Sequence, residues 1–297
     1  DGLSESYDTR AYVFAGPRPD DPDVVLTAYF PALELPPLPT SQVRLMQLLP
    51  RQDVDLAELV SVVETDPGLT VAALRAANSA ISSPVRRIGT ARAAVVRMGG
   101  LAARRMLGGY VLSSAFAIPQ GTAFNLDEYW KHALATALLA DAIAVKEGGR
   151  TEAFTAGLLH DVGCLAMACA QPERYARVVA LARRGMNELA AERAMFGFDH
   201  CYYGEQLAQQ WELPSMVVEA IVDHQQGTAN EFAQATARAR GISRRVGIGN
   251  GRAVLPGQMA LQRADHSVIR ALRGTDGLFQ QIAQFRDGMG ERARSEE

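Results

Sequence analysis

The chain has 297 residues, of which 48% are hydrophobic and 21% are charged. This composition is too apolar for a disordered protein, and the length predicts one large core or two smaller ones. The formal net charge of -3 argues against a protein that works mainly by neutralising nucleic-acid phosphates, because such domains usually carry a basic excess. Nucleic acid is therefore disfavoured as a partner.

The cysteines and the apolar runs indicate the cellular compartment in which the protein is expected. Cys164, Cys169 and Cys201 are an odd number without CxxC spacing, which indicates neither a disulfide framework nor a zinc knuckle. No run approaches the roughly 18 uninterrupted apolar residues of a membrane helix, and the N-terminus lacks a secretory pattern. We therefore expect a cytoplasmic protein without a membrane partner. The chain begins at Asp1 rather than Met, which suggests a fragment of something longer.

The first third of the chain changes from a Pro- and Gly-rich segment to helical spacing. Residues 1–32 are expected to be an N-terminal arm or the end of a preceding domain, with two short apolar runs that could be strands. Thr40-Ser41 is an N-cap candidate for the first helix, and Asp53 or Asp55 and then Thr90 are candidates further on. The apolar spacing predicts five helices, at about 43–49, 56–63, 69–80, 91–98 and 101–116.

A second group of helices is predicted after Ile118-Pro119-Gln120-Gly121, the clearest internal boundary. Asn125 or Asp127 caps a long helix there. A glycine-rich linker at 247–251 leads to weaker helical stretches at 258–272 and 277–290 and to a charged tail. Strand-like alternation is absent, so the fold class is all-α, as a two-lobed helical bundle. Further helices are predicted at 152–167, 172–184, 188–195, 200–211, 215–224 and 230–246.

Four of the five histidines fall in the second lobe, on or at the edge of predicted helices: His132, His160, His200 and His224. Imidazole is the commonest metal ligand, and Asp161 adds a hard oxygen ligand for Mg, Mn or Fe. His160 and Asp161 lie in the middle of an apolar helix, where an unpaired charge is costly. Two interpretations stay open, because neighbouring groups could satisfy the pair by hydrogen bonds or a metal ion could bind it.

A set of short motifs follows in order along both lobes. The chain carrying them resembles the HDOD family, the HD-related output domains of bacterial signalling proteins, which are relatives of HD and HD-GYP metal-dependent phosphohydrolases. The resemblance implies an HDOD domain over 33–249, in which an N-terminal helical lobe (33–118) packs on a degenerate HD-type helical core (119–249), followed by a C-terminal helical extension (250–297). The motifs begin at Leu35, Glu64, Leu74, Arg87, Trp130, Gly157, Gly197, Trp211 and Ile221.

The resemblance also implies a metal set. His132, His160 and Asp161 match the first three ligand positions of catalytic HD enzymes, and His200 and His224 resemble the additional histidines of HD-GYP proteins. We therefore expect these five residues to form a remnant or weak metal site. No cofactor is expected, and Mn, Fe or Mg would be the occupant if the site is filled.

The late aspartate of that metal set is missing. An ungapped placement puts Arg240 at its position, and no Asp or Glu occurs between Glu231 and Asp265. A guanidinium is permanently charged and does not bind a metal ion. The loss of this carboxylate disfavours hydrolysis, since less negative charge remains to hold a divalent cation.

The implied function is a non-catalytic signal-transduction output or scaffold module that acts through protein-protein contact, downstream of a sensory or receiver domain. One alternative is a metal-dependent phosphohydrolase or phosphodiesterase acting on a nucleotide or cyclic dinucleotide. Another is a nucleotide-binding receptor without turnover. A cluster of four arginines is a candidate for contacting a cyclic dinucleotide or an acidic partner helix, although a solvated face is favoured: Arg238, Arg240, Arg244 and Arg245.

The remaining candidates have ordinary structural interpretations. Arginines of the first lobe, including Arg104 and Arg105, are expected on a solvated helix face with scattered ion pairs. Trp130 and Trp211 are expected in the core or at the lobe interface. Cys164 is interpreted as a buried apolar filler, because no cationic activator lies near it in sequence.

Overall fold

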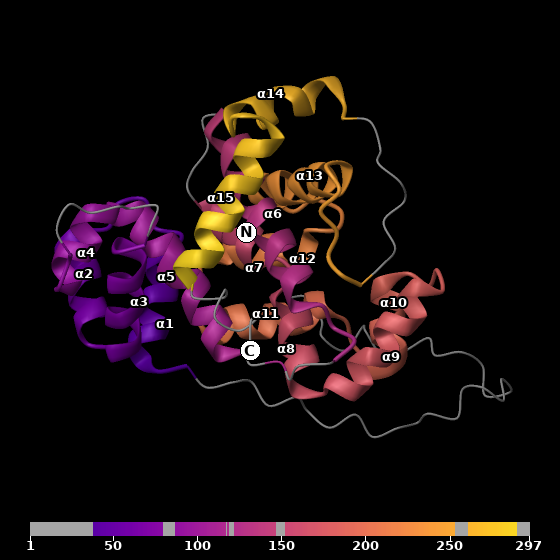
Figure 1. Ribbon diagram of the computed structural model, residues 1–297. Coiled ribbons are helices and arrows are strands. Elements are labelled where there is room, and N and C mark those ends of the chain that lie inside the picture. The colour runs from indigo at the N-terminus through magenta and orange to yellow at the C-terminus, as the bar shows by residue number, and fades with distance from the viewer. Residues whose placement is uncertain are drawn as a thin grey trace, which may run out of the picture. The chain divides into compact units, whose positions relative to one another are not determined.

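The coordinates are a computed structural model, which describes residues 38–79, 87–116, 118, 122–146, 152–252 and 261–289. Within these ranges the chain forms fifteen helices and no strand (Figure 1), which confirms the all-α prediction. Three sequence predictions lie outside the described residues: the arm at 1–32 with its apolar runs, the residues 119–121 of the lobe boundary, and the charged tail at 291–297.

The first five helices gather in one group, in which α5 packs against each of the other four. Asp55 and Thr90 cap α2 and α4 as predicted, since their side chains accept hydrogen bonds from Ala57 N and Ala93 N. The predicted cap at Thr40 is wrong, because α1 already begins at that residue. The bounds are α1 (Thr40–Leu48), α2 (Leu56–Glu64), α3 (Pro67–Ala77), α4 (Ala91–Met98) and α5 (Gly100–Ala115).

The second group is built around α6, which packs against both α7 and α13. α8 packs against α9 and α11, and α12 packs against α7, α11 and α13. Asn125 Oδ1 accepts a hydrogen bond from Glu128 N at the start of α6, as predicted. The bounds are α6 (Leu126–Lys146), α7 (Glu152–Leu159), α8 (Val162–Ala170), α9 (Pro172–Arg183), α10 (Glu188–Phe196), α11 (His200–Gln210), α12 (Ser215–Asp223) and α13 (Glu231–Arg245).

The prediction of one helix over 152–167 is wrong. α7 ends at Leu159 and α8 begins at Val162, so His160 and Asp161 form the turn between two helices. The bend lets both side chains face interior partners on other helices. Taken together, Glu152–Ala170 is long and apolar enough to span a membrane, but 89% of its most apolar window is buried inside the protein, which is typical of a core segment.

Two C-terminal helices connect the groups. α15 (Gly274–Met289) packs against α3 and α5 of the first group and α6 of the second, and α14 (Arg263–Ala271) packs against α6 and α15. Arg286 of α15 forms an ion pair with Asp127 of α6. The C-terminal extension is therefore part of the same compact unit as the two helical groups.

Aromatic and charged contacts join the two groups directly. The rings of Phe116 and Trp211 lie 6.5 Å apart between centroids, and both tryptophans are buried as predicted. Arg105 of α5 pairs with Asp141 of α6, with Nη2 2.5 Å from Oδ1. The ion pair of Arg105 agrees with the prediction, but its side chain is only 12% exposed. The predicted solvated face is wrong for Arg104 as well, whose buried Nη1 donates to Leu48 O at 2.6 Å.

Two glycines set how closely the helices of the second group approach. A Cβ on Gly157 would lie 2.7 Å from Ala137 Cα, so α7 packs directly on the backbone of α6. A Cβ on Gly163 would lie 2.1 Å from the carbonyl oxygen of His200, so α8 also packs directly on the backbone of the first turn of α11. These contacts bring the turn at residues 160–161 to His132 and His200.

The substitution Gly163→Ala tests this packing. Because backbone atoms surround the added methyl group, overpacking is expected to lower the free energy of unfolding by about 1–3 kcal/mol or more. Urea denaturation measures the change, and Gly89→Ala is the control because a Cβ there meets nothing within 4 Å. Equal stability of the two variants would contradict the close approach.

Candidate functional site

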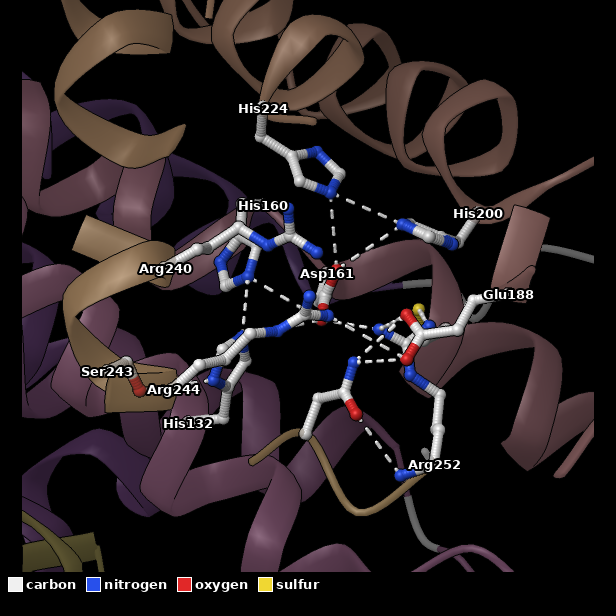
Figure 2. A network of polar contacts seen from close by, with 12 residues as sticks. His132, His160, Asp161, Glu188, His200, His224, Arg240, Ser243, Arg244 and Arg252 are labelled. Carbon is white, nitrogen blue, oxygen red and sulfur yellow. Dashed lines mark hydrogen bonds and ion pairs between the residues drawn. The ribbon is translucent and has the colours of Figure 1, made fainter. Parts of the chain in front are cut away.

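All five predicted ligands meet in one buried cluster around Asp161 (Figure 2). α6 supplies His132, and the turn between α7 and α8 supplies His160 and Asp161. His200 is the first residue of α11, and His224 is the C-cap of α12. Each of the five side chains is fully buried. The elements that bring them together are one turn, two helix ends and one helix interior.

The two carboxylate oxygens of Asp161 face two pairs of imidazoles. Oδ2 lies 3.5 Å from His160 Nε2 and 3.9 Å from His132 Nε2. Oδ1 lies 3.3 Å from His200 Nε2 and 3.4 Å from His224 Nε2. Within each pair the two Nε2 atoms are 3.3 Å apart. The side chain of Asp161 is therefore the centre about which all four rings are arranged.

The far side of each ring is fixed by a polar neighbour, which directs Nε2 towards Asp161. His160 Nδ1 lies 2.7 Å from the carbonyl oxygen of Gly157, and His224 Nδ1 lies 2.6 Å from that of Ile221. Because a carbonyl oxygen only accepts, both Nδ1 atoms carry the proton. The other two contacts are His200 Nδ1 with Glu192 Oε2 at 2.5 Å and His132 Nδ1 with Ser243 Oγ at 3.3 Å.

Hydrogen bonds alone can satisfy the four rings. When the Ser243 hydroxyl donates to His132 Nδ1, His132 Nε2–H can donate to the lone pair of His160 Nε2. His200 Nε2–H can donate to His224 Nε2 in the same way. This proton placement is assigned from the hydrogen-bond geometry. Neighbouring groups can thus satisfy His160 and the other three rings, whereas Asp161 Oδ1 accepts no hydrogen bond.

Burial controls the charge of the rings. Desolvation lowers the pKa of His132 to about 3 and that of His224 to about 4, and it lowers the pKa of His160 well below its usual range. These three rings are neutral at pH 7. Burial opposes the charged form of His200 as well, but Cys164 and the Glu192 carboxylate raise its pKa well above the usual range.

The positive charge that compensates Asp161 comes from Arg252, a residue that the sequence analysis did not single out. Arg252 Nη2 lies 2.8 Å from Asp161 Oδ2, and both side chains are almost completely buried. Burial would raise the pKa of Asp161, but the Arg252 guanidinium holds it well below its usual range. The carboxylate is therefore ionised and paired with an internal cation.

Two glutamates of α10 complete the surroundings of Arg252. Its Nη1 lies 3.1 Å from Glu192 Oε1, and its Nη2 lies 3.5 Å from Glu188 Oε2. Asn250 Nδ2 donates to both oxygens of Glu188, at 2.9 and 3.0 Å, and Asn250 Oδ1 accepts from Arg252 N at 3.2 Å. One guanidinium thus bridges three carboxylates from the α7–α8 turn and from α10.

Two sequence interpretations are corrected here. The glycine-rich segment at 247–251 is more than a linker, because Ile248 and Asn250 are buried and the segment carries Arg252 into the cluster. Cys164 is buried as expected, but its Sγ contacts Arg252 Nη1 and Glu192 Oε1. It therefore belongs to the polar network rather than to an apolar filling.

The predicted arginine cluster divides into two parts. Arg240 and Arg244 extend from α13 towards Asp161 (Figure 2). Arg238 and Arg245 instead bond to α14, through Ala264 O and the buried carboxylate of Asp265. Arg240, which the ungapped placement puts at the position of the late acidic ligand, donates from Nη1 to Gln225 Oε1 at 2.9 Å.

A metal ion fits this cluster only in part. Three groups have ligand atoms within 4.8 Å of one another: His132, His160 and Asp161; His200, Cys201 and His224; and Asp161, Cys164 and His200. Buried Asp161 Oδ1 accepts no hydrogen bond, which suits a cation. Two observations oppose a metal ion. Asp161 Oδ2 is already bound to Arg252, and Arg240, which extends from α13 towards Asp161, is cationic. The donor set suits a metal ion only where Arg252 does not occupy Asp161.

The fold and the cluster define a helical HD-type core with a preceding helical lobe. The family model of the HDOD domain matches residues 35–227, more than half of the chain, and the chain belongs to the HDOD family. A match at 26% identity over 195 residues is to an uncharacterized protein of Treponema pallidum (strain Nichols). It covers 64% of this chain and 37% of the length of that relative.

Solved structures share the fold. An HDOD domain protein of unknown function from Geobacter sulfurreducens is 26% identical, with a TM-score of 0.63 over 88% of this chain and 92% of that one. A candidate phosphohydrolase from Shewanella amazonensis SB2B is 25% identical, with a TM-score of 0.61 over 86% and 94%. A candidate signal transduction protein from Marinobacter aquaeolei VT8, 24% identical, has a TM-score of 0.64 over 88% and 60%.

Sequence reasoning missed Glu188, Glu192 and Arg252. The two glutamates are four residues apart and so share a helix face, which is a weak signal because most such pairs are exposed. Arg252 gives no local signal, since it lies 91 residues from Asp161 and outside any predicted helix. Only its tertiary contacts identify it.

Glu188 should link stability to pH on the acid side. Burial would raise its pKa, but Arg252 and Asn250 lower it to about 2 from 4.5. Its stabilisation is therefore present above pH 4.5 and is lost as the pH falls towards 2. We expect Glu188→Gln to reduce the free energy of unfolding at pH 7 by up to about 3 kcal/mol and to flatten the acid dependence.

Urea denaturation at a series of pH values from 7 down to 2 measures both effects. Exposed Glu64 provides the matched control as Glu64→Gln, which should retain the acid dependence of the wild type. The same loss of stability between pH 4.5 and 2 in wild type and Glu188→Gln would contradict the assignment.

Proposed function

We propose that this HDOD chain is a non-catalytic signal-transduction module that passes its signal on by contact with a partner protein in the bacterial cytoplasm. The observation that carries the proposal is the buried ion pair between Arg252 and Asp161, with 2.8 Å between Nη2 and Oδ2. The guanidinium of Arg252 binds the carboxylate of Asp161, which an HD-type phosphohydrolase would need as a ligand for its metal ion.

The chemistry of arginine explains why this pair disfavours hydrolysis. A catalytic metal ion offers an open coordination position and lowers the pKa of its bound water. A guanidinium provides a single delocalised positive charge and only N–H donors, so it cannot activate water in that way. Arg240 adds a second cation near the same carboxylate (Figure 2). Binding of a divalent cation would have to overcome both charges.

The family relationship supports the signalling part of the proposal. The chain belongs to the HDOD family, and the Marinobacter relative with the same fold is described as a candidate signal transduction protein. A module of this kind would present its helical surface to a partner, while the cluster around Asp161 holds the helices of the second group together. The upstream input would come from a sensory or receiver domain.

A second candidate function is a metal-dependent phosphohydrolase or phosphodiesterase acting on a nucleotide or cyclic dinucleotide. It is favoured by the Nε2 atoms of His132 and His160, which face each other at 3.3 Å. If the Ser243 hydroxyl donates to Ile248 O, at 3.1 Å, His132 Nε2 and His160 Nε2 both carry lone pairs. A cation between them would then be favourable. His132, His160 and Asp161 would hold it.

Metal analysis with an activity assay separates the two functions. Protein purified without chelators is expected to contain no stoichiometric Mn, Fe or Mg and to hydrolyse neither nucleotides nor cyclic dinucleotides. The result that would overturn the proposal is stoichiometric metal together with turnover that is lost in His160→Ala.

The substitution Arg252→Met tests the internal cation. It retains much of the side-chain volume but removes the guanidinium that pairs with Asp161, so the free energy of unfolding is expected to fall by about 3–5 kcal/mol. Since Asp161 is then released, Mn²⁺ should raise the melting temperature of this variant more than that of the wild type.

The matched control combines Arg252→Met with Asp161→Asn. With the carboxylate neutralised, this variant should recover part of the lost stability and respond to Mn²⁺ no more than the wild type does. Thermal unfolding with and without Mn²⁺ gives both quantities. Equal stabilisation of wild type and Arg252→Met by Mn²⁺ would show that Arg252 does not compete with a metal ion.

A further inference from the structure

Arg240 is a buried cation whose hydrogen-bonding capacity is largely unused. Its exposed fraction is 6%, and its Nη1 donates to the neutral amide oxygen of Gln225. Nε and Nη2 are buried and donate to no group. Among the residues that the structure describes, no carboxylate lies within ion-pair distance of Arg240. Buried charged donors without partners are costly, so this arrangement requires an explanation.

The two unused donors lie on the same edge of the guanidinium. Nε–H and one Nη–H point in the same direction and form the fork that binds two oxygens of one carboxylate or phosphate. Because Gln225 binds Arg240 through Nη1, it leaves the Nε and Nη2 edge available. The shape of the free edge therefore selects an oxyanion.

Arg244 lies between the buried Arg240 and the protein surface. It lies one turn further along α13, and 40% of its side chain is exposed. Its Nη2 makes only a long contact with Glu188 Oε1, at 3.8 Å, while Glu188 is bound more closely by Asn250. The nearby carboxylate of Asp161 is engaged by Arg252. Glu188 and Asp161 therefore neutralise the charges of Arg240 and Arg244 only in part. An anion bound beside these two arginines would interact favourably with both.

We propose that Arg240 and Arg244 form a binding site for the phosphate group of a small molecule. The low exposure of Arg240 favours a small anion over a carboxylate from a partner helix, which could not easily reach it. A tetrahedral phosphate offers several oxygens, so one pair can bind the fork of Arg240 and another oxygen can contact Arg244. The bound anion would neutralise the buried charge of Arg240.

This site goes beyond the proposed function and does not depend on it. Binding of phosphate needs neither a metal ion nor turnover, and it would also occur in a hydrolase. Within a signalling module, such a ligand would stabilise the conformation in which α13, α12 and the cluster around Asp161 are packed together. Absence of phosphate binding would therefore not bear on whether the protein is a hydrolase, and turnover would not bear on whether Arg240 and Arg244 bind phosphate.

Calorimetry and thermal unfolding of the full chain test the site with three probes: inorganic phosphate, a nucleoside 5′-monophosphate and its parent nucleoside. Phosphate is expected to bind saturably at one site and to raise the melting temperature relative to chloride at equal ionic strength. Tighter binding of the monophosphate identifies a nucleotide as the source, and equal affinity identifies free phosphate. Failure of both to bind at millimolar concentrations overturns the proposal, as does equal binding by the nucleoside.

Arg240→Gln gives the decisive comparison. Loss of the fork is expected to weaken phosphate binding at least about tenfold. The melting temperature in chloride is expected to stay equal or to rise, because a buried unpaired charge has been removed. A residue with a purely structural role would instead lower it. The matched control is Arg238→Gln, which removes the same charge from α13 at a residue bonded to Ala264 O and should retain binding.

A third variant guards against misfolding of Arg240→Gln. Arg240→Lys keeps the positive charge but removes the two-donor edge, so it should lose most of the affinity while retaining the helical circular dichroism of the wild type. Wild-type affinity in either Arg240 variant would show that phosphate binds elsewhere and would overturn the proposal.

Discussion

The buried ion pair between Asp161 and Arg252 is the interaction on which the second helical group depends. Burying two charges costs solvation free energy. The ion pair offsets this cost only when its geometry is good and further hydrogen bonds satisfy the remaining donors and acceptors. Arg252 meets the requirement by contacting Glu192 and Glu188 as well as Asp161. The pair therefore links the α7–α8 turn, α10 and the segment after α13 in one network.

The histidines show how the same arrangement can serve two purposes. In metal centres the outer nitrogen of each ligand histidine is held by a hydrogen-bond acceptor, which orients the inner nitrogen. Here three rings have such acceptors in Gly157 O, Ile221 O and Glu192, and the inner nitrogens converge on Asp161. The orientation of an HD-type ligand set is thus present. The charges around it differ, since a guanidinium provides the cation within the protein itself.

Arg240 extends the same change of charge to α13. A carboxylate at this position would have added negative charge to the cluster, whereas the guanidinium adds positive charge beside three neutral imidazoles. Burial and the neighbouring Arg244 and Arg252 lower the pKa of Arg240, although Asp161 raises it. The cluster therefore combines a carboxylate that is bound to Arg252 through one oxygen with a guanidinium whose Nε and Nη2 donate to no group. This imbalance is better suited to an anion than to a divalent cation.

Local sequence determined most of the helices and several of their ends, because helix periodicity and N-caps depend on residues within a few positions. The predicted helix at 230–246 agrees with α13, and Asp55 and Thr90 cap the helices they precede. The resemblance to the HDOD family located the five residues that meet around Asp161. Tertiary structure alone decided what satisfies them. Arg252 and Asp161 are 91 residues apart, and the turn between α7 and α8 places Asp161 against His200 and His224 of other helices. Long-range polar contacts form only when packing brings distant segments together and removes water, and no periodic pattern in the sequence records them.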